Sequence, residues 1–377
     1  MLYADVGGAV TGTSEYDRLK FEAILRGEAA MGIVAHNIGT AEARLGAEFL
    51  RQIAPKHRVP LLTCNVRDAS DDLLGERFRI VKAGGRKIVF VGVLSDSEAI
   101  SDVRIDSPRK AILSALSESA VDYDSLVVLA YLPEDELNEL AANLPEADLI
   151  VGGPTGQSIP PHRQGPTSIA SATNKGKFLA VFATPASFPV HWEGEVVEIT
   201  ARFEDEPQQK ANLDEFYETL GQRDLSPLQT SFADRLSTDA PESFRIAGTA
   251  NCRNCHTADC EAWDGSRHAH AWESLTKTGA QVDAYCQQCH VTGFGLPGGF
   301  ESARRSAMHA AVGCESCHGP SYGHVQNQQV HTTYFGRAHD QCTSCHDREN
   351  SPTFVYAAYW EQIQHGAGDA NEQRNEE

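Results

Sequence analysis

Residues 314–325 read CESCHGPSYGHV, and this stretch decides how the second half of the chain is interpreted. Two cysteines lie three positions apart, a histidine follows directly, and His324 comes six residues after that histidine. The pattern C-x-x-C-H occurs four times and uses eight of the ten cysteines, at Cys252–His256, Cys286–His290, Cys314–His318 and Cys342–His346. Such a repeat indicates one chemical role that is used four times.

The spacing within the pattern has a physical reason. Cysteines at i and i+3 project from one turn of backbone, so both sulfurs can form thioethers with the two vinyl groups of one haem, and the histidine at i+4 binds the iron. A zinc site would place its histidines further off, and a disulfide framework would not require a histidine after each cysteine pair. We therefore expect four haem c groups and no zinc. The predicted thioether positions are Cys252, Cys255, Cys286, Cys289, Cys314, Cys317, Cys342 and Cys345, and the predicted proximal ligands are His256, His290, His318 and His346.

The second face of each iron also needs a ligand or stays open. Residues 246–365 contain seven further histidines but only one methionine, Met308, so at least three irons must use histidine, another group or nothing there. Two histidines on one iron give a low reduction potential compared with a histidine and a methionine. This composition favours low-potential electron transfer.

Four segments of this region carry a resemblance to a known family. WDGSRHAHAWESL, YCQQCHVTGFGLPGGF, HAAVGCESCHGPSYGHV and CTSCHDRENSPTFVYAAYWEQIQHG resemble the multihaem cytochromes of the cytochrome c-554 type, over roughly the last 120 residues. The resemblance implies a mainly α, loop-rich fold with packed haem pairs. It also implies that His268, His324 and His365 are distal ligands, with His270 as the rival of His268.

For the fourth iron the candidates are His309, His339 and a vacant face. His309 could instead cover a haem edge, and His339 could hydrogen-bond a propionate. An open iron would allow catalysis on a small nitrogen or oxygen species, whereas a closed one would make the protein a pure electron carrier.

The first 205 residues have a different character. Apolar runs such as KIVFVGVL, SLVVLAYL and DLIVGG predict strands, and EYDRLKFEAILRGEAAM and EDELNELAANL predict amphipathic helices between them. This order predicts an α/β sandwich. We expect the α/β domain over 1–205, a helix and polar linker over 206–245, the haem domain over 246–365 and a disordered tail over 366–377.

The α/β half is similar to the metallophosphoesterase fold, in the branch of the 5′-nucleotidases. LYADVGG, AHNIGTAEARLGAEFL, GRKIVFVGVLS and ADLIVGGPTGQS follow its order. The metal ligands of that family are missing, because Gly8 stands where the aspartate of G-D would be and Tyr131 replaces a lone histidine. G-N-H-E reads Gly39–Glu42 as GTAE, and G-H-x-H reads Gly153–Gly156 as GPTG. A dimetal site needs carboxylate and imidazole ligands, so we expect no manganese, no phosphoesterase activity and a docking or supporting role.

Charge and hydropathy limit the partners. The formal net charge of −20 makes nucleic acid a poor partner and favours redox partner proteins with a basic surface. No apolar run reaches the roughly 18 residues of a membrane span. Covalent haem attachment takes place outside the cytoplasm, yet MLYADVGG is not a signal peptide. We therefore expect a periplasmic or extracellular bacterial protein whose signal sequence and first strand lie upstream of Met1.

The leading hypothesis is thus an exported electron-transfer protein with four haems. The alternative is a multihaem oxidoreductase with one five-coordinate haem, and a hydrolase is the least favoured.

Overall fold

The computed structural model describes residues 1–119, 122–155, 158–172, 176–184, 190–233, 241–305, 307–347 and 350–366. The chain divides into two compact units. The first unit comprises Met1–Thr13 and Asp17–Leu213, and the second comprises Ser14–Tyr16 and Asp214–Glu377. From residue 367 onward, the predicted tail lies outside the described residues, as does Gly156.

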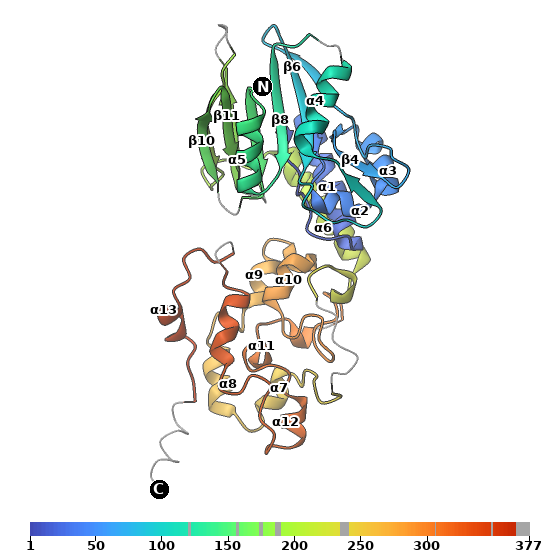
Figure 1. Cartoon of the computed structure of the whole chain (residues 1–377). Coiled ribbons are helices and arrows are strands. Elements are labelled where there is room, and N and C mark those ends of the chain that lie inside the picture. The colour runs from blue at the N-terminus through green and yellow to red at the C-terminus, as the bar shows by residue number, and fades with distance from the viewer. Residues whose placement is uncertain are drawn as a thin grey trace. The chain divides into compact units, whose positions relative to one another are not determined.

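The first unit is built on two sheets (Figure 1). Strands β1 (Ala4–Asp5), β2 (Ala35–Asn37) and β3 (Leu61–Leu62) pair in parallel. The larger sheet has six strands, and its interior pairs are parallel whereas both outer pairs are antiparallel. Its order is β10 (Ile159–Gln164), β11 (Thr167–Ser171), β9 (Leu149–Gly153), β8 (Ser125–Tyr131), β6 (Arg86–Leu94) and β5 (Arg79–Ala83).

Side chains of strand β6 alternate between the two faces of the large sheet and pack into a different core on each face. Val89, Val91 and Val93 pack into one core with residues of α4 (Pro108–Ser119) and α5 (Glu134–Asn143). Ile88 and Phe90 point the other way, into a core shared with β2 and β3. Because successive side chains of a strand face opposite sides, an uninterrupted apolar run marks a strand that is buried on both faces.

A third core lies on the outer face of the small sheet. It contains residues of α1 (Glu15–Met31), α2 (Thr40–Leu45) and α3 (Ala47–His57), among them Phe21, Ala43 and Leu50. The layer order is therefore helices, sheet, sheet, helices. The predicted α/β sandwich is confirmed, and α1 coincides with the predicted segment EYDRLKFEAILRGEAAM.

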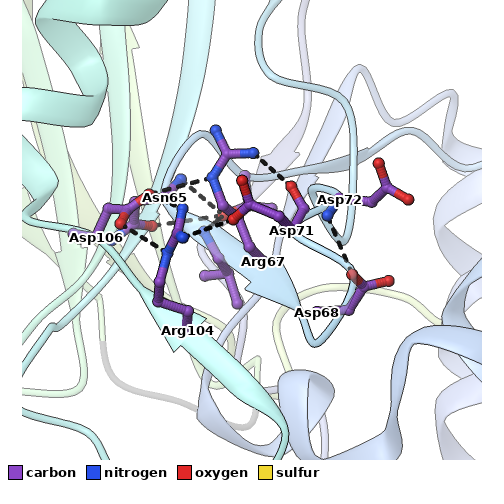
Figure 2. Close-up of polar contacts among 9 residues, drawn as sticks. Asn65, Arg67, Asp68, Asp71, Asp72, Arg104 and Asp106 are labelled. Atoms are coloured by element: carbon purple, nitrogen blue, oxygen red, sulfur yellow. Dashed lines mark hydrogen bonds and ion pairs between the residues drawn. The ribbon is translucent and has the colours of Figure 1, made fainter.

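Two smaller antiparallel ribbons complete the first unit. Strands β12 (Phe178–Ala183) and β13 (Glu193–Glu198) form one, and β4 (Val66–Asp68) and β7 (Val103–Ile105) form the other. Figure 2 shows the polar contacts around β4 and β7, in which Arg67 and Arg104 both bind the Asp106 carboxylate.

The second unit is helical. Helix α6 (Pro207–Arg223) begins in the first unit and ends in the second, and it lies within the range 206–245 in which a helix is predicted. Short helices follow, and no strand occurs among the described residues after 246, which confirms the mainly helical, loop-rich prediction. They are η1 (Pro227–Gln229), α7 (Thr249–Cys252), α8 (Thr257–Asp264), α9 (Ala271–Thr276), η2 (Ala280–Val282), α10 (Ala284–His290), η3 (Ala307–His309), α11 (Cys314–His318), α12 (Tyr322–Gln326), η4 (Ala338–Ser344) and α13 (Tyr356–Trp360).

Among the described residues, no helix combines the length and the apolar character that a membrane crossing requires.

Candidate haem sites

Each C-x-x-C-H pattern lies on or beside a short helix. Helix α11 consists of one pattern alone, Cys314–His318, and α10 ends with Cys286, Cys289 and His290. In the first and fourth patterns the histidine amide donates to the carbonyl of the first cysteine, at 2.9 Å in both cases. Positions i, i+3 and i+4 therefore share one face, which is the geometry that the thioether and iron-ligand prediction requires.

Imidazole rings from distant parts of the chain meet in pairs. Every pair joins a histidine of the C-x-x-C-H pattern to one of the three predicted distal histidines. The ring centres lie 6.3 Å apart for His256 and His324, 6.2 Å for His346 and His268, and 6.0 Å for His318 and His365. Two metal–nitrogen bonds of about 2 Å, with about 1 Å from each nitrogen to its ring centre, add to about 6 Å. The spacing thus fits one iron between the rings of each pair.

Hydrogen bonds to Nδ1 leave Nε2 available in several of these rings. The Nδ1 atom of His324 donates to the Val330 carbonyl at 2.7 Å, and that of His365 donates to the Ile363 carbonyl at 2.8 Å. In the same way, His290 donates to the Ala271 carbonyl at 2.9 Å. A carbonyl can only accept, so Nδ1 carries the hydrogen and the Nε2 lone pair is free for a metal.

The electrostatic surroundings keep three rings neutral. Burial lowers the pKa of His268, His318 and His346 below the usual histidine range, and the facing imidazole lowers it further for His268 and His318. Neutral imidazole is the form that binds metal. These rings are therefore ready to bind iron at neutral pH.

The cysteines of different patterns also meet. The thiols of Cys252 and Cys314 are hydrogen-bonded, and this contact lowers the pKa of Cys314 to about 6 while it raises that of Cys252. Cys289 and Cys345 form an equivalent contact, which lowers the pKa of Cys345 to about 7. The first pattern thus adjoins the third, and the second adjoins the fourth.

The sulfurs and imidazoles of two patterns line one cavity of about 840 Å³. Its walls include Cys252, Cys255, Cys314 and Cys317, together with the His256–His324 and His318–His365 pairs. Few apolar residues of the second unit are buried, among them Leu275 and Phe300. A cavity with paired sulfurs, facing imidazoles and a sparse apolar core fits a large flat iron cofactor.

The histidine of the second pattern, His290, has different surroundings. Within the described residues its ring contacts the Ala271 carbonyl and the Ser274 hydroxyl, and no second imidazole faces it. Of the two predicted candidates, His339 pairs with Asp340 at 3.0 Å, and His309 is buried with its Nδ1 unpartnered. His270, the rival of His268, is exposed and bonds to Glu273 at 2.9 Å.

Other groups lie where the phosphoesterase resemblance expects metal ligands. The Glu42 carboxylate accepts hydrogen bonds from the amides of Gly8 and Ala9, at 2.8 and 2.6 Å. Tyr131 covers the same place, because a Cβ at Gly8 would come within 2.6 Å of its ring. Where the phosphoesterase resemblance expects two metals, the structure has a carboxylate bound to backbone and a phenol ring.

The two units resemble different groups of known proteins. Residues 251–319 match the family model of cytochrome c554 and c-prime. Cytochrome c-554 of Nitrosomonas europaea is 38% identical over 100 residues, which are 22% of this chain and 41% of the relative. The chain thus spans about two fifths of the length of this curated relative. The predicted c-554 resemblance is confirmed for this region.

Solved structures resemble the other part of the chain. The sulfate thiohydrolase SoxB of Thermus thermophilus has a TM-score of 0.51 at 21% identity, over 62% of this chain and 44% of its own. A 5′-nucleotidase precursor from the same species has a TM-score of 0.49 at 18% identity, over 79% of this chain and 62% of its own. The likeness to SoxB shows the fold, and with it the predicted phosphoesterase-type sandwich is confirmed.

Proposed function

We propose that this chain, whose residues 251–319 match the cytochrome c554 and c-prime family, is an electron-transfer protein with four covalently bound c-type haems. The observation that carries the proposal is the set of three imidazole pairs at 6.0–6.3 Å, each formed by a C-x-x-C-H histidine and a histidine from another segment. Haem supplies one-electron redox chemistry when it is bound.

The side chains of this protein have separate roles in that proposal. The eight pattern cysteines anchor the cofactor, and the paired histidines bind iron from both faces. Carbonyl groups hold the Nδ1 atoms of His324, His365 and His290, so the ring orientation is set before metal binding. The contacts between Cys252 and Cys314 and between Cys289 and Cys345 support an arrangement in two neighbouring pairs.

A pyridine haemochrome assay together with iron analysis tests this proposal. We expect four haem c groups per chain and a reduction titration at low potential, because two histidines on one iron favour the ferric state relative to histidine and methionine. A colourless folded protein, or one that contains zinc and no iron, would refute it.

A second candidate function rests on His290. Because no imidazole faces this ring among the described residues, its iron would keep one open position, which suits an oxidoreductase acting on a small nitrogen or oxygen species. Low-temperature electron paramagnetic resonance (EPR) distinguishes the candidates. A high-spin ferric signal that cyanide abolishes supports the open site, and a fully low-spin spectrum supports the pure carrier.

The first unit would then serve as a support or docking body without hydrolytic activity. Two observations favour this proposal. Gly8 and Tyr131 stand where the phosphoesterase family has metal ligands, and the Glu42 carboxylate there is bound to backbone amides. We expect the full chain to leave a chromogenic phosphodiester intact with added Mn²⁺. Metal-dependent turnover above a blank would contradict this expectation.

We further propose a periplasmic or extracellular location and a redox partner with a basic surface. Covalent haem attachment requires export, and the net charge of −20 would attract a positively charged partner.

A further inference from the structure

We infer that Asp5, Glu28 and His36 form a site for one divalent first-row transition cation, held by two carboxylate oxygens and one imidazole nitrogen. The three residues come from the end of β1, from α1 and from β2. One ligand atom of each lies within 4.8 Å of the other two. Its three ligands are not among the residues that stand at the expected dimetal positions.

The three side chains are gathered around one nitrogen. The Nδ1 atom of His36 lies 2.9 and 3.0 Å from the two Glu28 oxygens and 3.9 Å from Oδ1 of Asp5. Their exposed side-chain fractions are 0% for His36, 2% for Glu28 and 31% for Asp5. Two ligands are thus fixed inside the protein, and the third borders solvent and gives a path of entry.

The charge around this point is unbalanced. Three carboxylates, Asp5, Glu28 and Glu42, surround a single imidazole. In the part of the chain that the structure describes, neither lysine nor arginine forms an ion pair with any of these four side chains. Buried carboxylates without a compensating charge are costly. A divalent cation would supply the missing positive charge.

A second observation concerns buried atoms without partners. The Nε2 atom of His36 and Oε2 of Glu42 have no hydrogen-bond partner, and both side chains are 0% exposed. The Nε2 atom lies 3.7 Å from Oε1 of Glu42. The Nδ1 atom faces a Glu28 oxygen at 2.9 Å, whereas Nε2 has no partner at hydrogen-bond distance.

Cation binding would satisfy these atoms together. With the cation on Nδ1, the ring hydrogen moves to Nε2 and points toward Glu42. Metal-bound histidines usually donate their other ring N–H to a carboxylate in this way. Glu42 is therefore a positioning residue for His36.

The ligand set indicates the class of ion. One imidazole nitrogen with two carboxylates suits Zn²⁺ or Mn²⁺, with water in the remaining positions. Calcium prefers six to eight oxygen ligands, so it fits less well. The ion would tie β1, β2 and α1 together.

The experiment uses the full haem-loaded chain, treated with a chelator and then dialysed against Zn²⁺ or Mn²⁺. We expect about one ion per chain by elemental analysis, and attenuation of the free Mn²⁺ EPR signal. His36→Gln and Asp5→Asn should each weaken Mn²⁺ binding at least tenfold. Asp5→Asn is the variant least expected to disturb folding, since Asp5 is partly exposed.

The matched control is Glu22→Gln, which alters a histidine–carboxylate pair outside the cluster, where Glu22 contacts His57 at 3.0 Å. This variant should bind as the parent does. X-ray absorption at the zinc edge should show nitrogen and oxygen ligands. Binding below a tenth of an ion per chain, unchanged affinity in Asp5→Asn and His36→Gln, or sulfur ligands to zinc would overturn the inference.

Discussion

At the scale of single residues, His324 and His331 show how strongly position decides the role of an imidazole. Both line the same cavity. His324 faces His256 with its Nδ1 bonded to a carbonyl, whereas His331 stacks on Phe335 with ring centres 4.0 Å apart. Only the first ring has a free Nε2 opposite another imidazole, so only the first is proposed as an iron ligand.

This contrast gives a prediction. His324→Ala should convert one low-spin haem to the high-spin form, because its iron loses a nitrogen ligand, and this should appear as a new high-spin ferric EPR signal. His331→Ala, the control, should leave the low-spin signals unchanged. Equal spectra for the two variants would contradict the pairing of His256 with His324.

At the scale of elements, α11 is too short to be stable alone, since isolated helices need roughly 12–15 residues even to be marginal. Its buried Glu315 compensates for this. The Glu315 carboxylate accepts from the amides of Ala247, Gly248 and Ser321, at 2.8, 2.7 and 2.8 Å. These bonds connect the segment just before the first C-x-x-C-H pattern to the helix that forms the third pattern.

We expect Glu315→Gln to lower the free energy of unfolding of the second unit by about 2 kcal/mol, because hydrogen bonds to a charged acceptor contribute about 1.5–3 kcal/mol. Denaturant unfolding followed by the haem absorbance measures this. The control is Glu273→Gln, whose side chain is 63% exposed and whose loss should have little effect on stability. Similar losses in both variants would refute the role of Glu315.

A second element-scale contact involves Asn65, which lies just before β4 (Figure 2). Its side-chain amide donates to the carbonyls of Leu94 and Asp106, at 2.7 and 2.9 Å, and its oxygen accepts from the Leu94 amide at 3.0 Å. Asn65 therefore joins the end of β6 to the segment that follows β7.

Asn65→Ala should destabilise the first unit by about 3 kcal/mol, because several buried backbone groups lose their partner at about 1–3 kcal/mol each. Thermal unfolding followed by far-ultraviolet circular dichroism measures the change. Asn143→Ala, at an exposed position with one amide bond to Glu139, should have little effect. A near-neutral Asn65→Ala would contradict the account of this junction.

At the scale of the whole molecule, we expect the net charge of −20 to steer the proposed redox partner toward the protein. Opposite charge raises association rates by roughly 10- to 1,000-fold, and salt screens the effect. The bimolecular rate of electron transfer to a basic single-haem cytochrome should therefore fall at least about tenfold between about 10 and 200 mM salt. Stopped-flow absorbance measures this rate, and an acidic acceptor serves as the control. A rate independent of salt would refute electrostatic steering.

An element could be predicted from the sequence where the contacts that stabilise it are local, and could not where they come from distant parts of the chain. The helix Glu15–Met31 and the strand at KIVFVGVL were predictable because their apolar pattern is local and long. Strands β1 and β3 have two residues each, too few for a periodic signal, and they exist only because the parallel pairing with β2 holds them.

The sequence by itself determined which residues are proposed as haem anchors, because two cysteines and a histidine within one helical turn need no distant partner. Only the tertiary structure decided that His256 faces His324, that His346 faces His268 and that Cys252 meets Cys314. It also decided that Asp5, Glu28 and His36 converge. The reason is that covalent spacing constrains neighbours along the chain, whereas residues far apart in sequence are brought together by the packing of the folded chain.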